Sequence, residues 1–198
     1  RVNLINDRGI HICKSMLAYQ RLSEGATPES TQTKGDHFVG DYYVRFEKAF
    51  VEEYSAWLDT PASDEAFEKW KTSRNGKSAV KAAGENKGPE PEKVFRSDYK
   101  ANYFNEHSEW GRAAKQMLLA WEEGDPEVVD LWKKMNQWVF DGFHQTYDRL
   151  GVSFDQVYYE SNTYLLGKDV VQRGLKANVF SQLEDGAVIF DLEKIGKK

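Results

Sequence analysis

The sequence predicts an α/β domain that is interrupted by a long helical insertion. Short strand-like apolar runs lie near both ends, at residues 2–5 and 154–159. Most of the chain between them repeats apolar side chains at the three-or-four spacing of helices. The 198 residues are 40% hydrophobic and 14% aromatic, which is typical of an ordered globular domain. Strands at both ends and helices between them therefore indicate one sheet with an inserted helical segment.

The first strand is followed by a polar corner and a helix. Residues 2–5 form a buried strand, and Asn6-Asp7-Arg8-Gly9 interrupts the apolar run. From about Ile10 to Leu22 apolar residues recur at helical spacing, until Gly25 ends the pattern. This order predicts a strand, a tight turn and a helix.

A loop and two helices are expected next. Residues 23–35 are rich in Gly, Pro, Ser and Thr, the composition of a surface loop. Asp36 can cap a helix that reaches Trp57, and Thr60-Pro61 is a start signal for a short further helix. The buried face of the longer helix is strongly aromatic, with Val39, Tyr43, Phe46, Phe50, Tyr54 and Trp57.

Residues 71–100 differ in composition from their surroundings. They hold eight Lys and Arg against four Asp and Glu, a local net charge of +4, together with several Gly and Pro. This composition predicts a flexible or extended linker. A track for phosphate groups is the less favoured alternative, because runs of charge are usually solvated faces.

Helices return after the linker, and strands follow them. Periodic apolar residues predict helices over 105–121 and 126–150, joined at Gly124-Asp125-Pro126 and packed as an antiparallel hairpin. Residues 154–159 are β-branched and aromatic, as in a strand, and 170–174 resembles the end of a helix. Residues 178–181 and 187–190 predict a β-hairpin that turns at Glu184-Asp185-Gly186.

Composition excludes several classes of function. The formal charge of −5 argues against a dedicated nucleic-acid module, which neutralises phosphates with Lys and Arg. A single cysteine, Cys13, excludes an internal disulfide and a multi-thiolate metal site. His11 and Cys13 are two apart on a helix and point to different sides, so no metal site is predicted. No run of about 20 apolar residues is present, and a cytoplasmic location is expected.

The corner Asn6-Asp7-Arg8-Gly9 is the first candidate site. It follows a strand and precedes a helix, the place where backbone amides and the positive helix end hold anions or nucleotides. The alternative is structural: Asn6 or Asp7 caps the helix, and Gly9 eases the turn. Spacing alone favours the capping alternative.

Glu160-Ser161 is the second candidate, at the end of the later strand. Ligands of open α/β sheets bind outside the carboxyl ends of the strands, so a carboxylate here can reach a cationic ligand. The alternative is again a helix cap by Ser161. The residues alone leave the two readings equally supported. No glycine-rich dinucleotide fingerprint, Walker loop or nucleophile elbow is present.

Taken together, the segments resemble the catalytic domain of arginyl-tRNA synthetases, which are class I aminoacyl-tRNA synthetases. The first motif, VNLINDRG at 2–9, is similar to the family's strand followed by Asn-Asp-Trp-Gly. Arg8 stands where Trp is common, and His11 stands where the family often has Gln. The further motifs, in the family's order, are KGDHFVGDYY at 34–43, WEEGDPE at 121–127 with Leu131-Trp132, and YDRLGVSFD at 147–155 running into YYES at 158–161.

This resemblance implies part of a Rossmann-type sheet interrupted by a mainly helical connective insertion. Residues 1–35 would be a first part of the Rossmann-type catalytic domain, and 36–150 would be the helical connective insertion, with an extension at about 59–104. Residues 151–198 would return to the catalytic domain and add a small hairpin. The family's ATP-binding His-Ile-Gly-His type signature is expected before residue 1, and its Lys-Met-Ser-Lys-Ser type loop after residue 198. We therefore expect a central fragment that is inactive alone.

The activity implied by the resemblance is ATP-dependent activation of L-arginine and its transfer to tRNA(Arg). ATP is a substrate, Mg²⁺ is expected in the full-length enzyme, and that enzyme is expected to be a monomer. Asn6, Asp7, Gly9 and His11 would line the cleft near adenosine or the amino acid. Glu160 would bind the guanidinium group in bidentate geometry, and Ser161 would be a substrate-binding residue next to it. The alternatives are a non-catalytic helical interaction module and another class I synthetase.

Overall fold

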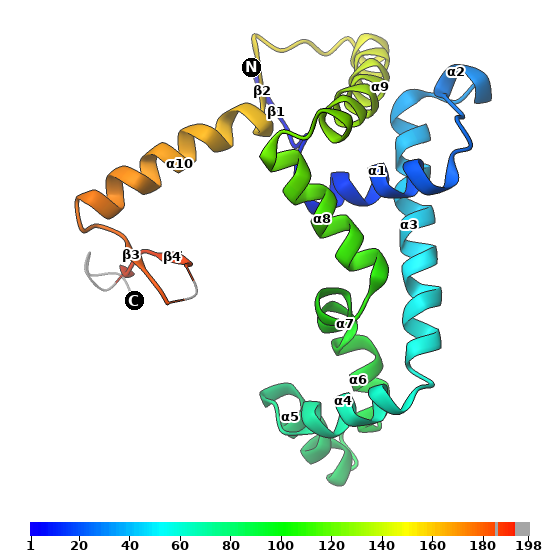
Figure 1. Cartoon of the computed structure of the whole chain (residues 1–198), viewed down its shortest axis with the longest axis vertical. Coiled ribbons are helices and arrows are strands. Elements are labelled where there is room, and N and C mark those ends of the chain that lie inside the picture. The colour runs from blue at the N-terminus through cyan, green and yellow to red at the C-terminus, as the bar shows by residue number, and fades with distance from the viewer. Residues whose placement is uncertain (185, 193–198) are drawn as a thin grey trace. The chain divides into compact units, whose positions relative to one another are not determined.

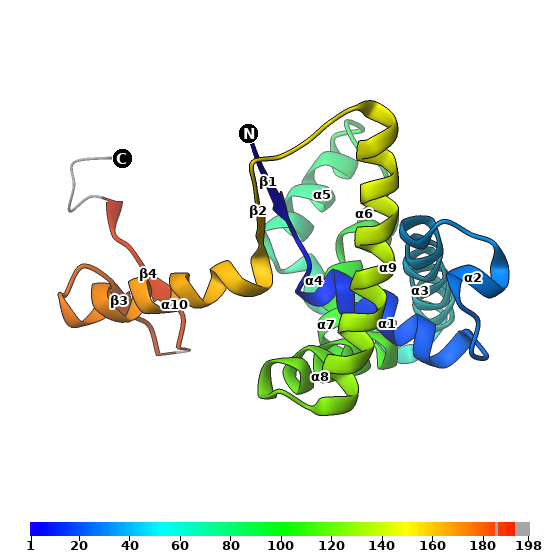
Figure 2. The ribbon, with the colours of Figure 1, turned by 90° about the horizontal axis from the view of Figure 1, so that it is seen from above.

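The computed structural model describes residues 1–184 and 186–192. The chain divides into two compact units. The first joins residues 1–8 to the chain from Tyr147 onward, and the second is the continuous stretch Gly9–Thr146. Figures 1 and 2 show the helices and strands of each unit.

A parallel pair of strands forms the centre of the first unit. β1 (Val2–Ile5) pairs with β2 (Gln156–Tyr159), in a register that sets Ile5 opposite Tyr159. The predicted strands therefore share a sheet although about 150 residues separate them. Parallel neighbours require a crossover connection, and here the helical unit lies within that connection in the sequence.

A helix and a small hairpin complete the first unit. α10 (Glu160–Lys176) begins directly after β2, and none of its residues is buried. It is much longer than the predicted helix end at 170–174. β3 (Ser181–Gln182) and β4 (Val188–Ile189) pair antiparallel, which confirms the predicted hairpin. Asp185 of the predicted turn lies outside the described residues.

Long amphipathic helices form the second unit. They are α1 (Ile10–Leu22), α3 (Gly35–Trp57), α8 (Glu109–Glu123) and α9 (Pro126–Leu150), whose last residues pass into the first unit. The predicted loop 23–35 also contains a short helix, α2 (Pro28–Thr31), which starts with a capping box. α1 packs against both α3 and α8, with Met16 and Phe46 fully buried.

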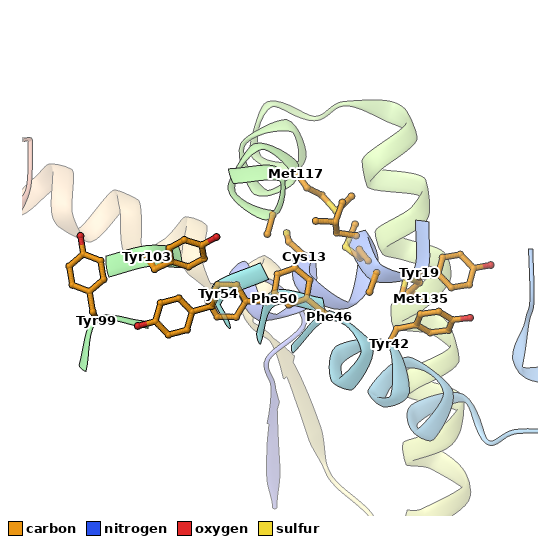
Figure 3. Close-up of a cluster of buried hydrophobic side chains, with 14 of the residues drawn as sticks. Cys13, Tyr19, Tyr42, Phe46, Phe50, Tyr54, Tyr99, Tyr103, Met117 and Met135 are labelled. Carbon is orange, nitrogen blue, oxygen red and sulfur yellow. The ribbon is translucent and has the colours of Figure 1, made fainter. Parts of the chain in front are cut away.

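The core of the helical unit is rich in aromatic rings. Figure 3 shows Tyr54, Tyr99 and Tyr103 gathered at one end of the cluster, and Tyr19 and Tyr42 at the other. Many of the rings meet edge to face, as between Phe46 and Trp110 (5.3 Å between centroids, 84°). This geometry is favoured by the quadrupole of the aromatic rings. The predicted buried stripe of α3 is right for Phe46, Phe50 and Tyr54, but its first half is shifted by one residue, because Phe38 and Tyr42 are buried in place of their neighbours at 39 and 43.

The prediction of a linker over residues 71–100 is wrong. After α4 (Pro61–Lys71), which confirms the predicted short helix, the chain forms α5 (Arg74–Gly84), α6 (Pro91–Asp98) and α7 (Lys100–Glu106). A few apolar residues are enough to build a small core, in which the ring centroids of Trp70 and Phe95 lie 5.6 Å apart. Gly76 brings α5 close to the backbone of Trp70. Gly76, which suggested a break in helical structure, therefore allows two helices to pack closely.

The predicted antiparallel hairpin of the two later helices is also wrong. Figures 1 and 2 show α8 and α9 crossing steeply, although Trp121 and Trp132 touch edge-on (5.3 Å between centroids). The described residues are thus mainly helical, with two small sheets of which one is parallel. Among these residues, no helix is both long and apolar enough to cross a membrane.

Candidate functional site

The carboxyl ends of β1 and β2 bring two of the predicted site segments together. Because Ile5 lies opposite Tyr159 in a parallel pair, both strands end at the same edge of the sheet. Asp7 follows the first strand by two residues, and Ser161 follows the second by two residues. The register therefore predicts that Asp7 and Ser161 meet, and they do.

Asp7 binds the first turn of α10 with both carboxylate oxygens. Its Oδ1 accepts a hydrogen bond from the Ser161 backbone N–H at 2.8 Å, and its Oδ2 accepts one from the Ser161 hydroxyl at 2.6 Å. The Asp7 residue is only 3% exposed. A carboxylate at a helix N-terminus satisfies an orphan amide and is favoured by the helix dipole.

This arrangement is a helix cap, but for a different helix from the one predicted. The capping alternative assigned Asn6 or Asp7 to the helix that directly follows them. α1 instead begins at the N-cap Gly9, where no side chain caps the helix. Asp7 caps α10, which begins more than 150 residues later in the chain.

Glu160 differs from Asp7 in that its carboxylate is available to a ligand. It is the first residue of α10 and is partly buried. Within the described part of the chain, no hydrogen bond or ion pair occupies this carboxylate. Asn6 is exposed at the same end of the strands. The edge of the sheet thus presents one saturated carboxylate, Asp7, and one that can still bind a cation.

Two tyrosines that contact the predicted segments, Tyr164 and Tyr147, were not predicted as site residues. The Arg8 guanidinium carbon lies 3.8 Å from the centre of the Tyr164 ring, a cation–π contact. Asn3 donates a hydrogen bond from Nδ2 to the Tyr147 hydroxyl at 3.1 Å. The spacing of Tyr164, four residues after Glu160, could have indicated that both share a face of one helix.

Gly9 and His11 belong to the helical unit, whereas the other four predicted site residues belong to the first unit. Gly9 has φ +105° at the start of α1, a conformation that other residues rarely adopt. His11 is exposed, and its Nδ1 lies 3.4 Å from the Tyr43 hydroxyl. In the described ranges, no group of three His, Cys, Asp or Glu is arranged to hold a metal ion.

The chain is similar to arginine–tRNA ligases. It is 43% identical to that of Bacteroides fragilis (strain YCH46) and 42% to that of Porphyromonas gingivalis (strain ATCC 33277), each over 196 residues. The enzyme of Flavobacterium psychrophilum is 44% identical over the same length. Each match covers 99% of this chain. No protein-family model matches.

The coverage of these relatives is partial. The chain spans 27% of the Bacteroides protein and 26% of the Flavobacterium protein, about a quarter of their length. The matches confirm the predicted resemblance to arginyl-tRNA synthetases and the expectation that the chain corresponds to a fragment of one.

Proposed function

Since nearly the whole chain aligns with about a quarter of arginine–tRNA ligases, we propose that it is a central segment of the catalytic domain of such an enzyme. The full-length protein then activates L-arginine with ATP and transfers it to tRNA(Arg). Identity of 42–44% over 99% of the chain is the observation that carries this proposal. It favours the ligase over a helical interaction module or a synthetase for another amino acid.

In this proposal β1 and β2 are neighbouring strands of a larger Rossmann-type sheet. Parallel sheets are normally covered on both faces. Val2 and Leu4 are nevertheless 67% and 68% exposed here, so the two strands suit a sheet that the rest of the protein completes. Residues 1–35 and 151–198 are proposed as catalytic-domain segments, and 36–150 as the connective insertion with its extension at about 59–104.

The arginine site is proposed at the carboxyl edge of these strands. Glu160 would accept the guanidinium group of the substrate, because a carboxylate pairs with guanidinium through two parallel hydrogen bonds. Asp7 would act as a positioning residue, since its two bonds to Ser161 fix the turn from which Glu160 extends. Asn6, Gly9 and His11 are proposed near the adenosine or the amino acid.

Activation requires the arginine carboxylate to lie in line with the α-phosphate of ATP. Positioning and electrostatic stabilisation therefore supply most of the catalysis. Holding the distant guanidinium at Glu160 orients the reacting carboxylate at the other end of the substrate. ATP is expected to carry Mg²⁺ on its phosphates, and no residue of this chain is proposed as a ligand of that ion. We place the full-length enzyme in the cytoplasm as a monomer.

The test is amino-acid-dependent pyrophosphate exchange by the full-length protein in the presence of tRNA(Arg). Exchange should depend on arginine. Exchange with glutamate or cysteine instead would reject the assignment. The 198-residue chain assayed alone should show no exchange with arginine, because the proposed catalytic domain is incomplete in it.

A further inference from the structure

The helix α5 carries a cationic stripe that the proposed function does not use. Arg74, Lys77 and Lys81 follow one another at spacings of three and four residues, which places them on one side of the helix. All three are exposed, and α5 contains no acidic residue. The stripe lies within the extension that the sequence suggested was a linker.

The packing of α5 fixes the direction in which this stripe faces. Gly76 and Ala79 are buried on the opposite side of the helix, against α4 and α6. A Cβ at Gly76 would lie 2.1 Å from the Trp70 carbonyl oxygen, so α5 cannot rotate without breaking a close contact. The Ser73 hydroxyl also accepts a hydrogen bond from the Gly76 N–H and caps the helix.

The charges of the stripe are not compensated by the surrounding chain. Lys71, just before α5, pairs with Glu68 at 2.7 Å, and Lys87, just after it, pairs with Glu85 at 2.8 Å. Within residues 1–184 and 186–192, no carboxylate lies within ion-pair distance of Arg74, Lys77 or Lys81. Three unpaired cations on a rigid helix, in a chain of net charge −5, indicate an anionic partner.

We infer that the stripe binds the sugar–phosphate backbone of RNA, which under the proposed function is that of tRNA. Arg74 and Lys81 are seven residue steps apart, which span about 10 Å at the rise of an α-helix. A nucleic-acid strand presents about three phosphates over that length. An anionic membrane is a poorer fit, because α5 exposes a single large apolar residue, Val80, which is too little for insertion into a bilayer.

The experiment compares two triple variants of the full-length protein. One is Arg74→Gln, Lys77→Gln, Lys81→Gln. The control, Lys48→Gln, Arg112→Gln, Lys133→Gln, removes the same charge from exposed positions on other helices. The dissociation constant for tRNA(Arg) is measured over a series of salt concentrations, because each phosphate contact adds about 0.7–0.9 to the salt slope.

The stripe variant should bind tRNA more weakly, and its slope should fall by about 2 to 3. The control should keep the parent slope. An unchanged slope in the stripe variant overturns the inference. Binding to anionic phosphatidylserine vesicles is measured as well, and a variant that binds these vesicles more weakly but binds tRNA as tightly as the parent also overturns it. Arginine-dependent exchange by the parent protein tests the proposed function separately, so a failure of the stripe can be told from a failure of the function.

Discussion

Asp7 shows how one residue can join chain segments that are far apart. Its carboxylate is buried and receives both a backbone and a hydroxyl hydrogen bond from Ser161. Hydrogen bonds to a charged group are stronger than neutral ones, and breaking them leaves a buried group unsatisfied. We therefore expect Asp7 to hold the first turn of α10 in place rather than to bind substrate through its own oxygens.

Replacing Asp7 by Asn should loosen that turn. Asn keeps the shape but loses the charge, and one of its two side-chain atoms can no longer accept a hydrogen bond. Hydrogen exchange at the Ser161 amide should report an opening free energy lower by about 2 kcal/mol. Asp169→Asn, on the exposed part of the same helix, is the matched control and should change little. Equal protection in both variants would contradict the capping role.

Two buried tyrosines should make the helical unit sensitive to alkali. Burial raises the pKa of both Tyr54 and Tyr103 to about 12, from a usual value near 10. Below about pH 10 the two phenols are neutral in both the folded and the unfolded chain. As pH rises from about 10 to 12 the unfolded chain ionises first, so the stability of the unit falls.

The expected measurement is the denaturant midpoint of the helical unit against pH. The parent should lose stability steadily between about pH 10 and 12. The variant Tyr54→Phe, Tyr103→Phe should start less stable, because Tyr54 donates a hydrogen bond to the Arg96 carbonyl. Its decline with pH should nevertheless be shallower. Parallel curves would show that these two phenols do not control the alkaline response.

At the residue scale, the sequence predicted that the two candidate segments follow strands, but not which hydrogen bonds join them. The polar corner and Glu160-Ser161 could be found because each follows a strand-like run. The partner of Asp7 could not be found, because that choice depends on the register between strands about 150 residues apart. The alternation of side chains within one strand indicates which face is buried, but not which residue of a distant strand lies opposite.

At the element scale, strongly periodic segments were predictable and weakly apolar ones were not. The strand at 2–5 and the helices at 10–22 and 126–150 have the predicted bounds. α5 and α6 were missed because they bury very few side chains each, mainly Gly76, Ala79 and Phe95. Tertiary packing, not propensity, makes these segments helical.

Gly76 and Gly84 of α5 provide a matched test of that packing. Gly76→Ala places a Cβ against the Trp70 carbonyl oxygen and should destabilise the α4–α6 cluster despite the better helix propensity of Ala. Gly84→Ala meets no atom within 4 Å and should be neutral or stabilising by up to about 1 kcal/mol. Hydrogen exchange of the α5 amides measures both effects. A stabilised Gly76→Ala variant would contradict the close contact.

At the scale of the whole molecule, the predicted order of strand, helices and strand is present. The parallel pairing of β1 and β2 agrees with the α/β prediction, while the larger sheet remains a proposal. The steep crossing of α8 and α9 could not be predicted from the turn between them. A short connection makes two helices neighbours, but the side chains at their contact set the angle between the helix axes. The exposed strands and the bare surface of α10 fit a segment that the longer relatives complete.

The measurement that tests the central claim most directly is the arginine KM of the full-length Glu160→Gln variant in pyrophosphate exchange. Removing the carboxylate that faces a guanidinium costs about 2 kcal/mol or more, so KM should rise about 30-fold or more. Glu127→Gln, in the exposed first turn of α9, should leave KM unchanged. An unchanged arginine KM in Glu160→Gln would show that the edge shared by β1 and β2 does not hold the substrate side chain.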